Sequence, residues 1–200
     1  MIVETDPTSR RVPGAFSPAK QRILETADKL FYSVGIHTVG IDRLIRESKV
    51  TKATFYKHYR AKDNLILEYV KHRHESEREE VEAIVADATS PADALHDLLD
   101  RVVAKIERPG FRGCAFLNAA AEFPEPRHPV RVLVTSHRDW YTGTVSELFR
   151  QAEHPLPGDA ADDFVLASDG AMSGGYAGDR VAAAAALQRT AESIFTAQQG

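Results

Sequence analysis

The sequence has one cysteine among its 200 residues and no apolar run long enough to cross a membrane. A single cysteine excludes an internal disulfide and fits a reducing compartment, so we expect a cytoplasmic protein. The opening residues, MIVETDPTSRRVPGAF, contain no apolar stretch after a charged one, and we expect no secretory signal there. With 43% hydrophobic residues, the chain can bury one sizeable helical core or two smaller coupled cores.

The sequence also lacks the patterns that would indicate catalysis or a metal site. In the run Gly170 to Gly175 a glycine precedes Ser173 by three residues, whereas a nucleophile elbow needs it two residues before the serine. Cys114, His128 and His137 do not have the spacing of a common zinc site. We therefore expect no enzyme, no cofactor and no metal, and interpret Cys114 as a buried structural thiol.

Charge is distributed unevenly along the chain. From Arg10 to Lys62 there are twelve Lys and Arg residues against four Asp and Glu, a net charge of +8. Since the whole chain carries −4, the remaining residues carry −12. This asymmetry indicates a polyanionic partner for the basic end and a separate role for the rest. Arg10 and Arg11 lie in an arm that is either a tail without function or a segment that enters a minor groove.

The stretch from Gly35 to Leu65 predicts two short helices joined by a tight turn. Ile41, Leu44 and Ile45 recur at helical spacing and share one apolar face. Thr51 is suited to cap the second helix, 51–59. Two such helices also occur in proteins that never bind nucleic acid, but the basic charge favours DNA. The residues that would face the DNA supply cations, hydroxyls and one small side chain: Thr51, Lys52, Ala53, Thr54, Tyr56, Lys57, His58 and, at the next helix start, Lys62.

This stretch resembles the TetR/AcrR-like family of transcriptional regulators. The family's pattern is matched without a gap at Gly35, Val50, Thr51, Lys52, Thr54, Phe55, Tyr56, His58, Tyr59, Lys62 and Leu65. The sequence departs from the pattern where Lys49 replaces the turn glycine, Gly40 replaces a Ser or Thr, and Arg60 and Ala61 replace Pro-Ser. We expect Lys49 to adopt a left-handed backbone and Ala61 to leave the next helix without a side-chain cap. The motif resemblance covers roughly residues 17 to 70.

The resemblance implies an all-α chain in three parts: a flexible N-terminal arm (1–16), a helix-turn-helix, three-helix DNA-binding domain (17–62), and a helical regulatory, ligand-binding and dimerisation domain (63–200). Beyond residue 62, periodicity and Ser-Pro starts predict a long helix to about Val85, followed by helices at about 90–108, 113–123, 130–153, 160–176 and 180–198. We interpret the charged run KHRHESEREE (71–80) in the long helix as a solvated face.

The family keeps a ligand cavity in its regulatory domain. Aromatic and sulfur side chains with a few polar groups are our candidates for its lining: Phe116, Asn118, Glu122, His137, Trp140, Tyr141, Phe164 and Met172. The alternative is that Phe116, Trp140 and Met172 are ordinary core residues. In the family the last two helices pair with their copies as a four-helix bundle, and Gly175, Ala185 and Gln188 are our candidates for that dimer interface.

The sequence therefore predicts a DNA-binding transcriptional regulator, a repressor that binds a palindromic double-stranded DNA operator as a homodimer. The resemblance further implies that an unidentified small-molecule effector releases it, with no membrane partner. The alternative function is an all-α enzyme or small-ligand carrier whose helix-turn-helix is vestigial.

Overall fold

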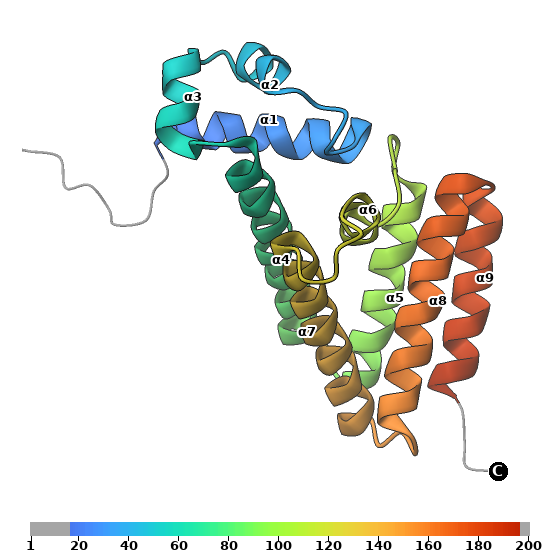
Figure 1. Ribbon diagram of the computed structural model, residues 1–200. Helices are drawn as coiled ribbons and strands as arrows, with labels where there is room; N and C mark the ends of the chain where they lie inside the picture. Colours follow the sequence, from blue (N-terminus) through green and yellow to red (C-terminus); the bar gives the residue numbers. More distant parts are fainter. Residues whose placement is uncertain (1–16, 197–200) are drawn as a thin grey trace, which may run out of the picture.

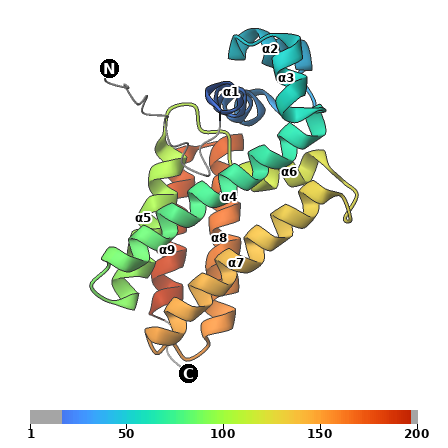
Figure 2. The ribbon, with the colours of Figure 1, turned by 90° about the vertical axis from the view of Figure 1, so that its left-hand side faces the viewer.

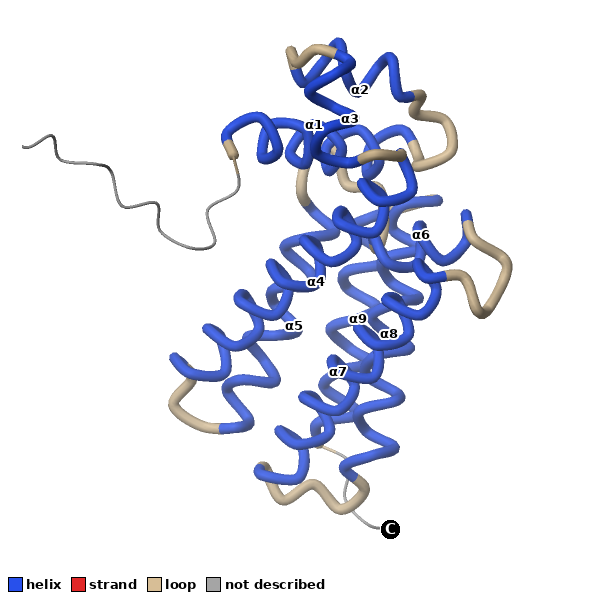
Figure 3. The backbone as a smooth tube through the Cα atoms, turned by 60° about the vertical axis from the view of Figure 1, so that its left-hand side comes forward, coloured by secondary structure: helices blue, strands red, loops and turns tan. Residues whose placement is uncertain are grey.

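The computed structural model describes residues 17–196, and within that range it consists of nine helices without a strand (Figures 1 and 3). The all-α prediction is therefore confirmed. The predicted arm with Arg10 and Arg11 lies outside the described residues. The helices are α1 (Pro18–Val34), α2 (Ile41–Ser48), α3 (Lys52–Tyr59), α4 (Lys62–Asp87), α5 (Pro91–Glu107), α6 (Ala115–Glu122), α7 (Pro129–Gln151), α8 (Pro157–Ala177) and α9 (Arg180–Phe195).

Local chemistry sets most helix ends. The side chains of Ser17, Thr51 and Ser90 each accept a hydrogen bond from a backbone N–H in the first turn of the helix that follows. Lys49, at the end of α2, has a left-handed backbone with φ 54° and ψ 44°, and Ala61 supplies no side-chain cap to α4. These features confirm the expectations drawn from the departures in the sequence pattern.

Two helix ends differ from the prediction. α8 begins at Pro157, before the predicted start at about residue 160, because proline is tolerated in a first turn where its missing N–H needs no partner. α7 ends at Gln151, and Glu153, with a left-handed φ of 59°, lies outside it.

The first three helices pack on the start of α4, and their hydrophobic core continues into α6 and α7. Leu65, Ile66, Tyr69 and Val70 on α4 share that core with residues of α1, α2 and α3. Phe116 and Phe123 at the two ends of α6, and Val130 and Val134 on α7, are buried in the same cluster. Residue 62 is therefore the start of α4, and the first hydrophobic core continues without a break past this predicted domain boundary.

A second core lies among α5, α7, α8 and α9. α5, α8 and α9 run side by side in Figures 1 and 2, and α7 crosses them at an angle (Figure 2). α4 starts beside α3 and crosses α5, α8 and α9 diagonally (Figure 2). In its second half, Val81 is buried in the second core. Its 26 residues span about 39 Å at 1.5 Å per residue. One continuous helix thus contacts both cores. None of the helices between residues 17 and 196 is long and apolar enough to cross a membrane.

Candidate nucleic-acid interface and ligand cavity

The helix α3 turns one side inward and the other to solvent. Phe55 and Tyr59 are buried in the first core, 0% and 3% exposed. Lys52, Ala53 and Lys57 are exposed, and Tyr56 keeps 39% of its surface accessible with its ring edge against Phe55. Within residues 17–196, no carboxylate pairs with Lys52 or Lys57. The outward face of α3 therefore presents two uncommitted cations to a polyanion.

Three of the predicted DNA-facing side chains already make hydrogen bonds within the protein. The hydroxyl of Thr51 accepts from the backbone N–H of Thr54 at 3.1 Å, and the two hydroxyl oxygens lie 2.9 Å apart. His58 Nε2 lies 3.3 Å from Ser17 Oγ at the start of α1. The contact between Ser17 and His58 was missed, because it joins positions 41 residues apart that no sequence spacing relates. It holds the end of α3 against the start of α1.

Lys62 does not face the same way as the other predicted cations. Its Nζ donates to the backbone carbonyl of Ile36 at 2.7 Å and lies 5.8 Å from the centre of the Phe31 ring. Burial lowers the pKa of Lys62. Its ammonium therefore anchors the loop between α1 and α2, whereas the exposed Lys49 and Arg60 are cations beside α3 that the sequence analysis left out.

That loop is also held by Glu122, the last residue of α6. Its carboxylate accepts from the backbone N–H of Ile36 at 2.8 Å and from that of His37 at 2.6 Å. His37 Nε2 in turn donates to the carbonyl of Glu122 at 2.8 Å. The sequence predicts Glu122 as a ligand contact. In the structure it instead joins α6 to the loop between α1 and α2, whose residues lie about 85 positions earlier in the sequence.

A cavity of about 210 Å³ lies between α4, α5, α7 and α8, closed on one side by the loop before α6. Val102, Phe116, Val165 and Met172 supply apolar wall. The remaining wall is strongly polar and includes Arg73, Glu77, Arg101, Lys105, Arg138, Ser168 and Asp169.

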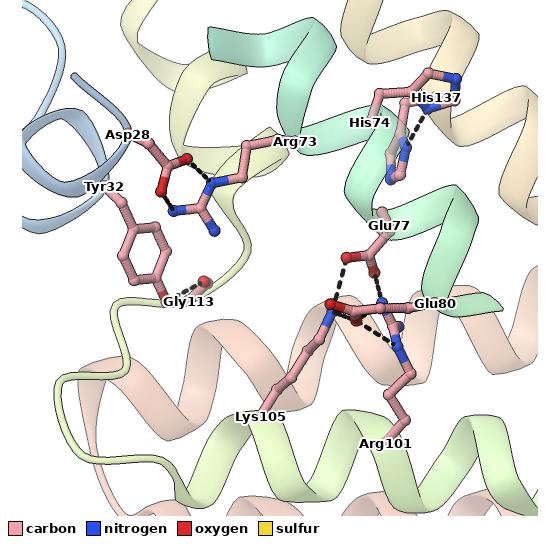
Figure 4. A network of polar contacts seen from close by, with 10 residues as sticks. All are labelled: Asp28, Tyr32, Arg73, His74, Glu77, Glu80, Arg101, Lys105, Gly113 and His137. Atoms are coloured by element: carbon pink, nitrogen blue, oxygen red, sulfur yellow. Dashed lines mark hydrogen bonds and ion pairs between the residues drawn. The ribbon is translucent and has the colours of Figure 1, made fainter. Parts of the chain in front are cut away.

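Most of the charged groups around this cavity are paired, as Figure 4 shows. The Glu77 carboxylate binds Arg101 at 2.6 Å and Lys105 at 2.7 Å, and both cations also reach Glu80. The two cations hold the pKa of Glu77 below its ordinary value against the opposing effect of burial. On the same helix, Arg73 binds both carboxylate oxygens of Asp28 on α1, at 2.5 and 3.0 Å. The interpretation of residues 71–80 as a solvated face was therefore wrong for the inward-facing members of the run.

Two histidines form a contact between α4 and α7. The Nδ1 atoms of His74 and His137 are 3.0 Å apart, and the His137 ring stacks on Phe116 with centroids 3.5 Å apart. Burial lowers the pKa of His137 to about 4, so its ring is neutral at pH 7. Trp140 packs edge-on against His74, 5.3 Å between ring centroids.

Two hydroxyls in the cavity wall have no partner. Among the described residues, neither Tyr141 Oη nor Ser168 Oγ has a hydrogen-bond partner, although both oxygens are buried. Burial raises the pKa of Tyr141, so the phenol stays protonated. Cys114 lines the same cavity, and burial raises the pKa of its thiol, which is therefore protonated at neutral pH. Buried polar groups without partners are uncommon in folded proteins and mark places where a missing partner fits.

Four of the eight predicted ligand residues line this cavity: Phe116, His137, Tyr141 and Met172. Asn118 instead donates its amide to the carbonyl of Arg112 at 2.8 Å. Phe164 is fully buried in the second core beside Phe195, and Trp140 packs against the rings of His74 and His137. With Glu122, these three positions lie outside the wall.

Comparison with known proteins identifies the family. Residues 23–69 match the family model described as bacterial regulatory proteins, tetR family. A TetR-family transcriptional regulator from Streptomyces coelicolor has a similar crystal structure, with 39% sequence identity and a TM-score of 0.85, covering 88% of this chain and 94% of that one. This chain belongs to the TetR family of transcriptional regulators. It is therefore a DNA-binding regulator with the helix-turn-helix at α2 and α3.

Two further matches have lower sequence identity. The transcriptional regulator LmrA of Bacillus subtilis (strain 168) is 27% identical over 86 residues, which are 42% of this chain and 46% of LmrA. The chain thus matches less than half of LmrA's length. The reduced form of Escherichia coli NemR has the same fold with a TM-score of 0.75 at 14% identity, covering 88% of this chain and 95% of NemR. LmrA and the Streptomyces coelicolor protein are both named as transcriptional regulators.

The dimer candidates of this TetR-family chain lie in different environments. Gly175 is buried inside the chain, where an added Cβ would be 3.0 Å from the Ile106 side chain on α5. It therefore allows α8 to approach α5 and is not on the surface. Ala185 is half-buried and Gln188 exposed on α9. The exposed large apolar side chains on α8 and α9 are Leu166 (63%), Tyr176 (44%) and Val181 (74%).

Residues 17–196 contain no group of three or more His, Cys, Asp or Glu side chains arranged to hold an ion. His128 caps α7 and stacks on Phe123, whereas His137 faces the cavity. The three residues considered from the sequence, Cys114, His128 and His137, thus do not form one site.

Proposed function

We propose that this TetR-family regulator is a repressor that binds a near-palindromic operator as a homodimer and is released by a small molecule bound in the cavity. The observation that carries the proposal is the physical connection between the DNA-facing helix α3 and the cavity. α4 begins beside α3 and lines the cavity, and Glu122 joins the adjoining α6 to the loop before α2. We divide the chain accordingly into an arm (1–16), a DNA-binding domain (17–62) and a regulatory domain (63–200).

The proposed DNA contacts lie on the outward face of α3. Lys52 and Lys57 contact phosphates, because their ammonium groups are exposed and uncommitted. Ala53 and Tyr56 lie on the same exposed face, where they approach the groove. Thr51, Thr54 and His58 complete this surface as groups already oriented by local hydrogen bonds. Lys62 supports the domain from within and is left out of the phosphate contacts.

A homodimer supplies the second recognition helix that one short α3 cannot. A helix of eight residues covers part of one major groove, so useful affinity requires two copies related by a two-fold axis. The proposed interface is formed by α8 and α9, which carry the exposed Leu166 and Val181, the half-buried Ala185 and the exposed Gln188.

The DNA-binding test uses purified full-length protein and fragments that flank its own gene. Retardation of one fragment at physiological salt is expected, and Lys52→Ala and Lys57→Ala should each reduce the slope of log affinity against log salt by about one. Lys71→Ala is the matched control, because Lys71 is an exposed lysine on α4 away from α3. Unchanged affinity of the folded double variant Tyr56→Ala/Lys57→Ala would refute the proposed surface. A protein that binds ligands but retards no fragment would favour the carrier alternative.

The assembly test uses Ala185→Arg. A bulky cation at this half-buried position should split the dimer and abolish operator binding while the helical content is kept. Ala86→Arg, at an exposed position near the end of α4, is the control and should remain dimeric. Light scattering that shows an undisturbed Ala185→Arg dimer would place the interface elsewhere.

A further inference from the structure

We propose that the cavity accepts an uncharged, compact molecule that has one apolar ring and one hydrogen-bonding group, such as an amide, a ketone or a phenol. The inference rests on the proposed function of the cavity as the effector site and names the chemical class of that effector. Three observations carry it: the pairing of the charged wall groups, the two unpartnered hydroxyls, and the size of the space.

Most of the charged groups around the cavity already pair with one another. Arg101 and Lys105 share the two carboxylates Glu77 and Glu80 through four contacts between 2.6 and 3.5 Å. On the opposite wall Arg138 binds Asp169 at 2.5 Å. Arg73 is likewise occupied by Asp28 through two contacts.

Four cations are thus matched by four carboxylates. A charged ligand would have to displace a carboxylate from its cation or remain unpaired in a half-enclosed space, and both are costly. The exposed Arg108 at the end of α5 is a cation of the lining without an ion-pair partner among the described residues. It lies where solvent screens its charge, so it does not offset the cost of placing an anion deeper.

The unsatisfied groups in the wall are neutral hydroxyls. Tyr141 Oη and Ser168 Oγ are buried and without a partner, and Ser168 is only 2% exposed as a residue. Each can donate and accept, so a carbonyl, amide or hydroxyl on the ligand satisfies at least one of them. The neutral ring of His137 adds a further uncharged group to the same wall.

The volume of the cavity and its apolar wall determine the remaining features of the proposed ligand. About 210 Å³ is below the range of about 300–1,000 Å³ typical of drug-sized ligands, and it suits a single ring with a short substituent. Phe116, Val102, Val165 and Met172 provide apolar contacts for such a ring. Water alone would satisfy the hydroxyls but would leave these apolar surfaces hydrated.

The experiment compares four probes of similar size and different charge: benzamide, benzoate, benzylamine and toluene. Each is titrated at pH 7 into the full-length protein, with binding followed by calorimetry and by the rise in Tm. Benzamide should bind most tightly. Benzoate and the benzylammonium ion should bind at least tenfold more weakly because of their charge, and toluene more weakly than benzamide because it makes no hydrogen bond.

Two variants test the hydroxyls. Tyr141→Phe and Ser168→Ala should each weaken benzamide binding about three- to tenfold, the range for one neutral hydrogen bond, and leave toluene binding almost unchanged. Tyr59→Phe and Ser193→Ala are the controls, since both hydroxyls lie far from the cavity wall. Without probe, Tyr141→Phe should keep or raise the Tm, because it removes a buried hydroxyl without a partner.

The outcomes separate this inference from the proposed function. Tighter binding of benzoate or benzylamine than of benzamide would overturn the uncharged class. Binding of none of the probes at millimolar concentration would overturn the cavity as their site. Operator retardation is measured without any probe, so a protein that fails to bind DNA yet prefers benzamide refutes the repressor role alone.

Discussion

The carboxylate of Glu122 is the most informative single group to change, because it joins the regulatory helix α6 to the DNA-binding helices. Its two oxygens accept from the N–H groups of Ile36 and His37, while Lys62 holds the carbonyl of Ile36 from the other side. In Glu122→Gln one oxygen becomes an NH2 group. A donor then faces the N–H of Ile36 or His37, and one charge-assisted hydrogen bond is replaced by an unfavourable contact.

The expected loss of stability follows from these bonds. A hydrogen bond to a charged group contributes about 1.5–3 kcal/mol, and the carboxylate is half-buried with His37 exposed, so we expect about 2 kcal/mol. For a chain of this length that corresponds to a fall in Tm of about 4–8 °C. Amide hydrogen exchange at Ile36 and His37 should accelerate, whereas exchange in the α8 and α9 bundle should change little.

Glu125→Gln is the control for this measurement. Glu125 is exposed in the loop after α6 and accepts only a local backbone bond, from Arg127 at 3.3 Å. Its Tm should stay within about 1 °C of the parent, as expected for a surface substitution. Equal stability and equal exchange of the 36–37 loop in Glu122→Gln and the parent would show that Glu122 does not join the two parts.

Three further predictions test other features of the structure. The pKa of His137 is about 4 in the folded chain, so between pH 6.5 and 4 the unfolded chain binds more protons at this residue than the folded chain does. The free energy of unfolding should therefore fall by about 3 kcal/mol as the pH falls through this window. Urea titrations of His137→Gln at a series of pH values should show a free energy of unfolding that depends less steeply on pH. Lys62→Ala should lower the Tm without changing the salt dependence of operator affinity. Lys57→Ala should reduce that salt dependence and leave the Tm unchanged. An equal reduction of the salt dependence in both variants would show that Lys62 also contacts the DNA. Gly175→Val should destabilise the chain by about 1–3 kcal/mol, because the new side chain would press on Ile106. If the variant instead dissociated the dimer and left the Tm of the monomer unchanged, Gly175 would lie at the dimer interface.

The fold could be predicted because its determinants are local. Helical spacing of apolar residues and the caps at Ser17, Thr51 and Ser90 lie within a few positions of the helices that they define. The division of α3 into a buried side with Phe55 and an exposed side with Lys52 also follows from periodicity alone. Such patterns depend on neighbours in sequence and not on how distant helices meet.

The cavity and the joints between helices could not be predicted in this way. Glu77 belongs to a charged run that is typical of a solvated face, and it turns inward because Arg101 and Lys105 on α5 meet it from more than 20 residues away. Glu122 was selected as a polar group near a ligand, but its partners are backbone N–H groups on a loop about 85 residues earlier. Burial of Gly175 likewise depends on the approach of α5.

The proposed release of DNA requires a physical connection from the cavity wall to α1 and α2, and the structure has three. Arg73 lines the cavity and binds Asp28 on α1. The hydroxyl of Tyr32, also on α1, donates to the carbonyl of Gly113 in the cavity-wall loop at 3.0 Å (Figure 4). Glu122 is the third connection, through α6.

Each of these connections is a hydrogen bond or ion pair of about 1–2 kcal/mol, since all are partly exposed. A ligand that changes the free energy of one of them by that amount would lower operator affinity about 5- to 30-fold, within the range of measured allosteric couplings. No large rearrangement of the cores is therefore required. Because coupling is reciprocal, operator DNA must weaken binding of the same ligand by the same factor, and equal ligand affinity for free and operator-bound dimer would exclude this mechanism.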